Sequence, residues 1–165
     1  MPNWCENHLY IEATESEILA IVNTISKETG FLAYLVPEPE HGPDEEGKLP
    51  QWYQWRVDNW GTKRDPLPEI VTEHATALTL HFDSAWSPPL TALQNWQAQD
   101  SENRSFNLRF IEWGMGFCGE EDSDGISCVV NIPTTVAMCM EVIPAELDEE
   151  FGICDTVAQW ETEEA

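Results

Sequence analysis

Apolar and polar residues alternate along three segments of the chain, which is the pattern of a strand with one buried face. These segments are residues 3–13, 76–84 and 105–113. In the first segment Leu9 and Ile11 fall on one side and polar residues fall on the other. The outward sides of the three segments carry Glu6, His8, Tyr10, Glu12, Thr79, His81, Asp83, Asn107, Arg109 and Trp113. The pattern therefore predicts strands of an antiparallel sheet with one buried face.

The remaining apolar segments predict two more strands and several helices. The strands are expected at 31–35, a short apolar run, and at 126–132. Apolar residues at helical spacing predict helices over 15–28 and 88–99. Helical spacing returns in the last third of the chain, where Gly152 interrupts it. We therefore expect either one broken helix or two short helices there.

The order of these elements predicts an α+β fold, a ferredoxin-like split β-α-β sandwich. Its domain is expected over residues 1–132, with a long aromatic-rich insert at 37–75. An acidic helical extension is expected over 133–165. Because both helices pack on one face of the sheet, the other face is either open or covered by the C-terminal segment.

The net charge of the chain adds most to what the predicted elements indicate. The 165 residues carry a formal net charge of −24, and residues 110–165 contain 14 acidic residues and no Lys or Arg. Such a surface repels nucleic acids and anionic membranes and attracts basic proteins. Two interpretations stay open at this point. The acidity serves solubility or salt adaptation, or the surface mimics the phosphate array of a nucleic acid.

The chain has the composition expected of a cytoplasmic protein. No apolar run approaches the roughly 20 residues that span a membrane, and "MPNWCENH" lacks the features of a signal peptide. The five cysteines include no C-x-x-C pair, so they are expected to be buried thiols. Only Cys5 and His8 approach the spacing of zinc ligands, and they should point in opposite directions on a strand. No metal or other cofactor is expected.

Residues 52–65, "WYQWRVDNWGTKRD", combine aromatic rings with three of the seven basic residues. This composition is found at nucleic-acid and phosphate sites. It also suits a plug that anchors a long insert. The functional interpretation places a pocket around Trp60, Lys63 and Arg64. The full candidate pocket adds residues of the predicted sheet face and consists of Trp60, Lys63, Arg64, His81, Asp83 and Arg109.

The outward sheet face offers a second kind of chemistry. His8 and His81, with nearby carboxylates, have the residue types for acid–base catalysis or metal binding. RNA recognition is disfavoured because Arg109 is the only base predicted on this face. Residues 120–127, "EEDSDGIS", resemble a calcium loop, but the twelfth position is Asn131 instead of Glu. A hairpin turn is expected there.

Four stretches in order, "MPNWCENHLYI", "WYQWRVDNWGTK", "AWSPP" and "EWGMGFCGE", resemble the YubB-like (Api-like) ferredoxin-fold family of phage and plasmid proteins. The resemblance covers residues 1–132. It implies a ferredoxin-like fold and an origin on a mobile element. It implies no activity, because the family has no established function.

These observations lead to a hypothesis of a non-enzymatic accessory protein. Its acidic surface would mimic nucleic acid and inhibit a basic host nucleic-acid-handling or defence protein, or a nucleoprotein complex. The carboxylates expected to bind this partner are Glu120, Glu121, Asp122, Asp124, Asp148, Glu149 and Glu150. No direct contact with nucleic acid or a membrane is expected, and the sequence predicts no oligomeric state. Two alternatives stay open: a hydrolase or transferase that uses the His8/His81 face, with or without a metal, and an acidic housekeeping binding module.

Overall fold

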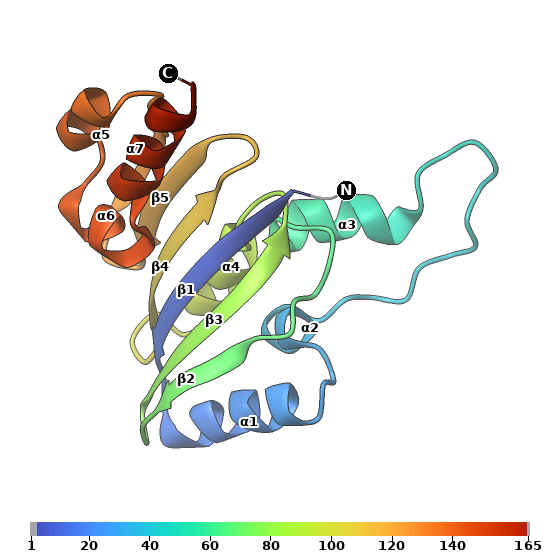
Figure 1. The fold of residues 1–165 in the computed structure, drawn as a ribbon. Helices are drawn as coiled ribbons and strands as arrows, with labels where there is room; N and C mark the ends of the chain where they lie inside the picture. The colour runs from blue at the N-terminus through green and yellow to red at the C-terminus, as the bar shows by residue number, and fades with distance from the viewer. Residues whose placement is uncertain (1–2, 165) are drawn as a thin grey trace.

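A six-stranded antiparallel sheet with helices on both of its faces forms the centre of the protein (Figure 1). The computed structural model describes residues 3–164, so the first two residues of the predicted domain and the last residue of the predicted extension lie outside it. The strands are β1 (Trp4–Glu12), β2 (Glu69–Glu73), β3 (Ala77–Ala85), β4 (Ser105–Glu112), β5 (Phe117–Asp122) and β6 (Ser127–Asn131). Within the described residues seven helices accompany them: α1 (Glu15–Ser26), α2 (Phe31–Leu35), α3 (Gln51–Trp60), α4 (Leu90–Gln99), α5 (Val136–Val142), α6 (Ala145–Phe151) and α7 (Ile153–Glu164).

The strands lie in the order β2-β3-β1-β4-β5-β6. The first four positions are consistent with a ferredoxin-like arrangement, and β5 and β6 extend the sheet through consecutive hairpins. Strand β1 pairs antiparallel with both β3 and β4, so the α+β prediction is confirmed. No helix within residues 3–164 has both the length and the apolar composition needed to cross a bilayer.

The larger hydrophobic core lies between one face of the sheet and helices α1, α2 and α4. Leu9, Leu80 and Leu108 are adjacent on the three central strands and are fully buried. Ile21 of α1 and Trp96 of α4 are buried in the same core. The predicted alternation of β1, β3 and β4 is confirmed, because the apolar positions are the ones that this core buries.

A second core lies on the opposite face, under helices α5, α6 and α7 (Figure 1). Ile111 of β4 and Cys118 of β5 pack there against Leu147 and Val157. The C-terminal segment therefore covers the outer face over β4 and β5, which was one of the two expectations. The helices number three where the sequence predicted one or two. Over β1 and β3 the same face is open, because Glu6, Tyr10 and Asp83 are exposed there.

The predicted strand at 31–35 is wrong, because this run forms helix α2. Its buried residues are Phe31, Leu32 and Leu35, a spacing that one turn of helix satisfies. The backbone N–H groups of Leu32 and Ala33 donate to the Asp65 carboxylate at 2.8 and 2.9 Å. A carboxylate distant in sequence thus satisfies amides that have no partner within the helix.

Two strands were not predicted. Strand β2 takes the sheet position that was expected for residues 31–35, so the segment that joins α1 to this position is 27–68. Strand β5 includes residues 120–122, which were expected to belong to a turn. Gly119 lets this strand pass the core closely, since a Cβ atom there would lie 2.6 Å from Cζ of Phe110 and 2.5 Å from the Cys128 carbonyl oxygen.

The aromatic segment is a structural plug. The Trp60 side chain is only 1% exposed, and its Nε1 donates to the Val36 carbonyl at 2.9 Å. Trp55 is partly buried and meets the Trp60 ring edge-on, with 5.7 Å between the ring centroids. The Arg56 guanidinium lies 5.0 Å from the Trp60 ring centroid and pairs with Glu38 at 2.7 Å. Helix α3 therefore anchors the long loop 37–50 to the core.

Burial of Trp60 predicts a large contribution to stability. We expect Trp60→Ala to lower the free energy of unfolding by about 3–5 kcal/mol, because it removes core contacts and leaves a cavity. Trp4→Ala removes an equally large side chain that is 47% exposed, and it should cost less than half as much. Denaturant unfolding of both variants measures the difference. Equal losses would contradict the buried position of Trp60.

The Glu38 pair predicts a pH dependence. Burial acts to raise the pKa of the Glu38 carboxyl, but hydrogen bonds and charge from Arg56 and His41 outweigh it and hold the pKa below 4.5, its ordinary value. The ionised carboxylate therefore stabilises the folded chain above pH 4.5, and this contribution is lost as the pH falls through the folded-state pKa. The native chain should lose its stability advantage over Glu38→Gln on acidification. Denaturant titrations at several pH values check this, and a constant difference would contradict it.

Candidate functional site

Two stacked histidine rings lie on the outer face of the sheet. His8 of β1 and His81 of β3 are direct cross-strand partners, so their side chains leave the same face. Their ring centroids are 3.6 Å apart, and the ring planes differ by 5°. The ring of Phe151, the last residue of α6, lies 4.8 Å from that of His8. The pair therefore sits at the border between the open and the covered half of this face.

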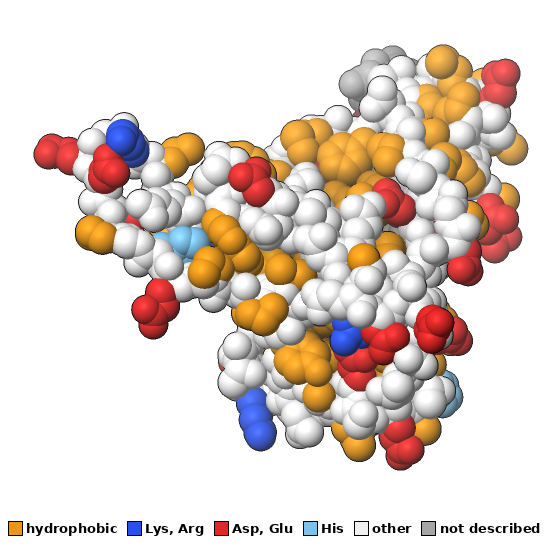
Figure 2. Space-filling view, turned by 180° about the vertical axis from the view of Figure 1, so that it is seen from behind, with side chains coloured by type: hydrophobic (Ala, Val, Ile, Leu, Met, Phe, Trp, Pro, Cys, Tyr) orange, Lys and Arg blue, Asp and Glu red, His pale blue; other side chains and the backbone are white. Residues whose placement is uncertain are grey.

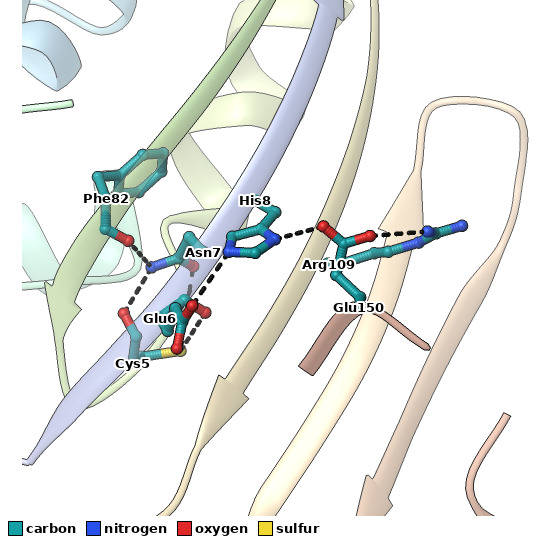
Figure 3. A network of polar contacts seen from close by, with 7 residues as sticks. All are labelled: Cys5, Glu6, Asn7, His8, Phe82, Arg109 and Glu150. Atoms are coloured by element: carbon teal, nitrogen blue, oxygen red, sulfur yellow. Dashed lines mark hydrogen bonds and ion pairs between the residues drawn. The ribbon is translucent and has the colours of Figure 1, made fainter. Parts of the chain in front are cut away.

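Polar contacts link His8 to Glu150 of the C-terminal layer and, through Glu150, to Arg109 (Figure 3). His8 Nδ1 is hydrogen-bonded to Oε1 of Glu150 on α6, and its Nε2 lies 3.1 Å from Oε1 of Glu6. Arg109 donates from Nη1 to Oε2 of Glu150 at 3.3 Å and from Nε to Glu120 at 3.2 Å. Both nitrogens of His8 thus face carboxylates, and Glu150 lies between His8 and Arg109.

The surroundings shift the pKa values of three groups in and near this cluster: Glu150, His81 and Asp83. Burial acts to raise the pKa of the Glu150 carboxyl, but hydrogen bonds and charge from His8 and Arg109 outweigh it, so the pKa is lowered. Burial, reinforced by the neighbouring His8, lowers the pKa of His81. Burial and the charge of Glu6 raise the pKa of Asp83. His81 is therefore a neutral imidazole near neutral pH, with a lone pair free to accept.

The opposite side of β1 belongs to the core. The Asn7 side-chain amide is fully buried and donates to the carbonyl oxygens of Cys5 and Phe82 at 2.7 and 3.2 Å (Figure 3). It also donates to Ser84 Oγ at 2.9 Å. Burial raises the pKa of the Cys5 thiol to about 12. Cys5 and His8 therefore face opposite sides of β1, as the alternation predicted, and the thiol takes no part in the site.

An open cleft of about 480 Å³ lies beside the histidines. It is lined by Glu6, His8, Leu67, Glu69, His81, Phe82 and Asp83. Three carboxylates and two imidazoles make this lining acidic, so it attracts cations. None of the lining residues is a Ser, Thr or Cys, so the cleft contains no hydroxyl or thiol nucleophile.

The six residues of the predicted pocket do not form one site. Trp60 is buried in the core, and Lys63 Nζ lies 4.0 Å from the ring centroid of Trp86. Arg64 and Asp83 share the lining of a second cleft, of about 400 Å³. His81 and Asp83 line the larger cleft, while Arg109 is engaged by Glu120 and Glu150.

Several of the predicted partner-binding carboxylates have contacts within the chain. Glu120 accepts from Arg109 and from Asn107 Nδ2, and Glu121 accepts from the Gln94 side chain. Asp122 accepts from the backbone N–H groups of Asp124 and Ile126, which makes the expected turn and not a calcium loop. Asp148 accepts from the Cys154 backbone N–H at 2.7 Å, and Glu150 binds His8 and Arg109. Asp124 and Glu149 are exposed.

Sequence reasoning missed two contributors to this region. Glu69 reaches the cleft from β2, a strand that was not predicted. The run Ile70-Val71-Thr72 was the available signal, since β-branched residues favour strands. The contact of Phe151 with His8 had no signal in the sequence, because it depends on how α6 docks.

Arg109 links the sheet to α6, which predicts a structural effect of its loss. We expect Arg109→Ala to destabilise the chain by about 1–3 kcal/mol, because two partly buried carboxylates lose their charged partner. Lys48→Ala removes an exposed ion pair and should cost within about 0.5 kcal/mol. Denaturant unfolding measures both, and hydrogen exchange in 145–151 reports the docking of α6. Unchanged exchange in Arg109→Ala would contradict this link.

Comparison of the chain with protein-family models, with curated proteins and with solved structures finds no match.

Proposed function

We propose that this chain is a non-enzymatic binding protein that attaches to a basic protein through its C-terminal helical layer, α5 to α7. The supporting observation is the one-signed charge of this layer. Its exposed acidic residues are Glu141, Glu146, Glu149, Glu150, Asp155, Glu161 and Glu163, of which Glu150 is paired with Arg109; the side chain of Glu164 lies outside the described part. Because residues 110–165 contain no Lys or Arg, no cation of this segment offsets that charge.

The basic residues elsewhere do little to offset this field. Arg56 pairs with Glu38 at 2.7 Å, and Arg104 pairs with Glu17 at 2.8 Å. Arg109 is held by two carboxylates, and Lys48 pairs with Glu45. Four of the seven basic residues are thus matched within the chain. In Figure 2, which shows one face, acidic side chains far outnumber the basic ones. A surface of one sign accelerates association with a partner of opposite sign.

The proposed partner is a protein with a Lys- and Arg-rich groove that normally holds nucleic acid. Carboxylates fixed on a packed helical layer present negative charge on a rigid surface, as a phosphate backbone does. The resemblance of residues 1–132 to YubB-like proteins of phages and plasmids supports a mobile-element origin. The strand order β2-β3-β1-β4 supports the ferredoxin-like sandwich that this resemblance implies. A host defence nuclease is the partner class that fits an inhibitor from such an element.

The two alternatives receive less support. A hydrolase or transferase would use the His8/His81 cleft, whose lining supplies acid–base groups but no Ser, Thr or Cys nucleophile. A housekeeping module has the same fold and charge, but it would have no preference for a partner that handles nucleic acid. Competition by DNA separates this alternative from the proposal.

The proposal predicts that high salt and competing DNA each release the bound partner from this chain. We expect the immobilised chain to retain a nucleic-acid-binding protein from host lysate at low salt and to lose it at high salt, because exposed charges are screened. A short DNA duplex should compete for the same protein. If no such protein is retained at low salt, or if DNA fails to displace it, the proposal is wrong.

Charge-neutral variants locate the contact. The triple variant Glu146→Gln, Glu149→Gln, Asp155→Asn removes three exposed charges from the helical layer. We expect it to bind the retained partner about tenfold more weakly, because each exposed pair contributes about 0.5 kcal/mol. The matched control, Glu46→Gln, Glu73→Gln, Glu102→Gln, removes the same charge from exposed positions outside this layer. Equal weakening by both variants would assign binding to net charge alone and contradict this surface.

A further inference from the structure

We propose that His8, His81 and Glu150 form a binding site for a divalent transition metal ion of the zinc type. One possible ligand atom from each residue lies within 4.8 Å of the other two. Two imidazole nitrogens with one carboxylate oxygen are a donor set that zinc prefers. The inference does not rest on the proposed function, because that function uses the outward surface of the helical layer.

The fold holds these donors on rigid elements. His8 lies on β1, which has a paired strand on each side, and the antiparallel register fixes His81 directly opposite. Glu150 comes from α6, a helix that the fully buried Leu147 fixes in the second core. The three residues thus come from three elements, and no flexible loop carries a ligand. Such preorganisation lowers the cost of ordering the site when an ion binds.

Neighbouring groups orient two of the ligands. Glu6 Oε1 lies 3.1 Å from His8 Nε2, which directs the other nitrogen, Nδ1, toward Glu150. A carboxylate on the second nitrogen of a ligating histidine is a recurrent feature of metal sites. Arg109 holds Oε2 of Glu150 at 3.3 Å and leaves Oε1 toward His8. The ion takes the place of the proton shared by His8 and Glu150, and this proton passes to solvent.

Binding requires one movement, because the lone pairs of imidazole lie in the ring plane. In the parallel stack the two rings are 3.6 Å apart, so one of them must turn before both lone pairs meet at one ion. His81 is the ring that can turn, since it borders the open cleft and no side-chain hydrogen bond holds it within residues 3–164. Glu6 and Glu150 hold His8 in place.

The surroundings favour zinc over harder or softer ions. Magnesium and calcium prefer shells of oxygen atoms, and two imidazoles do not suit them. Copper(I) prefers sulfur donors, and the Cys5 thiol lies on the other side of β1. Three protein ligands leave the fourth position of a tetrahedral ion for water at the cleft. The carboxylates of Glu6, Glu69 and Asp83 around that cleft balance the charge of the ion.

Titration of the chelator-treated full chain with Co(II), followed by competition with Zn(II), tests the site. We expect each chain to bind one Co(II) ion, with the visible absorption of Co(II) in a coordination site of low symmetry. His81→Ala and Glu150→Gln should each weaken binding by about tenfold or more. His74→Ala, which removes an exposed histidine from the turn after β2, should leave the affinity unchanged.

The His81 variant keeps the test valid if Glu150→Gln disturbs α6, because His81 makes no side-chain hydrogen bond that folding could need within residues 3–164. Circular dichroism of each variant confirms that it is folded. The proposal is overturned if cobalt gives no absorption with the native chain, or if folded His81→Ala binds as tightly as His74→Ala. These measurements contain no partner protein, so their failure leaves the proposed function standing.

Discussion

The pairing of β1 with β3 and β4 is the interaction on which the rest of the structure depends. Its register places Leu9 between Leu80 and Leu108, and His8 between His81 and Arg109. Because side chains alternate along a strand, a shift of one residue would turn His8 into the core and Leu9 into solvent. The same register therefore determines both the hydrophobic core and the polar cluster on the opposite face.

The C-terminal layer shows how a chain with so much like charge stays folded. Its inner residues Leu147, Ile153 and Val157 are fully buried, while most of its acidic residues are exposed. Removal of apolar surface from water contributes about 1.5–3 kcal/mol for each such side chain. Repulsion between exposed carboxylates is screened by water and salt. Burial on the inner side thus outweighs repulsion on the outer side, and the outer side is free to carry charge.

The alternation of apolar and polar residues predicted those parts of the fold that depend on neighbouring positions in the sequence. The alternation in β1, β3 and β4 identified their faces, because one face of each strand is buried along its whole length. The run at 31–35 was wrongly assigned to a strand, since a short apolar run fits a strand or a helix. Asp65, which is distant in sequence, helps to favour the helix. The contact between His8 and Glu150 spans 142 positions in the sequence. The periodicity of apolar residues cannot predict a contact over this separation. That the C-terminal segment covers the outer face of the sheet was one of the expectations.

The two cores lie on opposite faces of the sheet, and β4 and β5 contribute residues to both of them. Detachment of the C-terminal helices would leave the contacts within the first core in place. Such subglobal opening would separate Glu150 from His8 without unfolding β1. The protein thus has two hydrophobic cores of different size, and the contact of His8 with Glu150 joins the elements that form them. A ligand that needs both halves of this cluster would tie the smaller unit to the larger one.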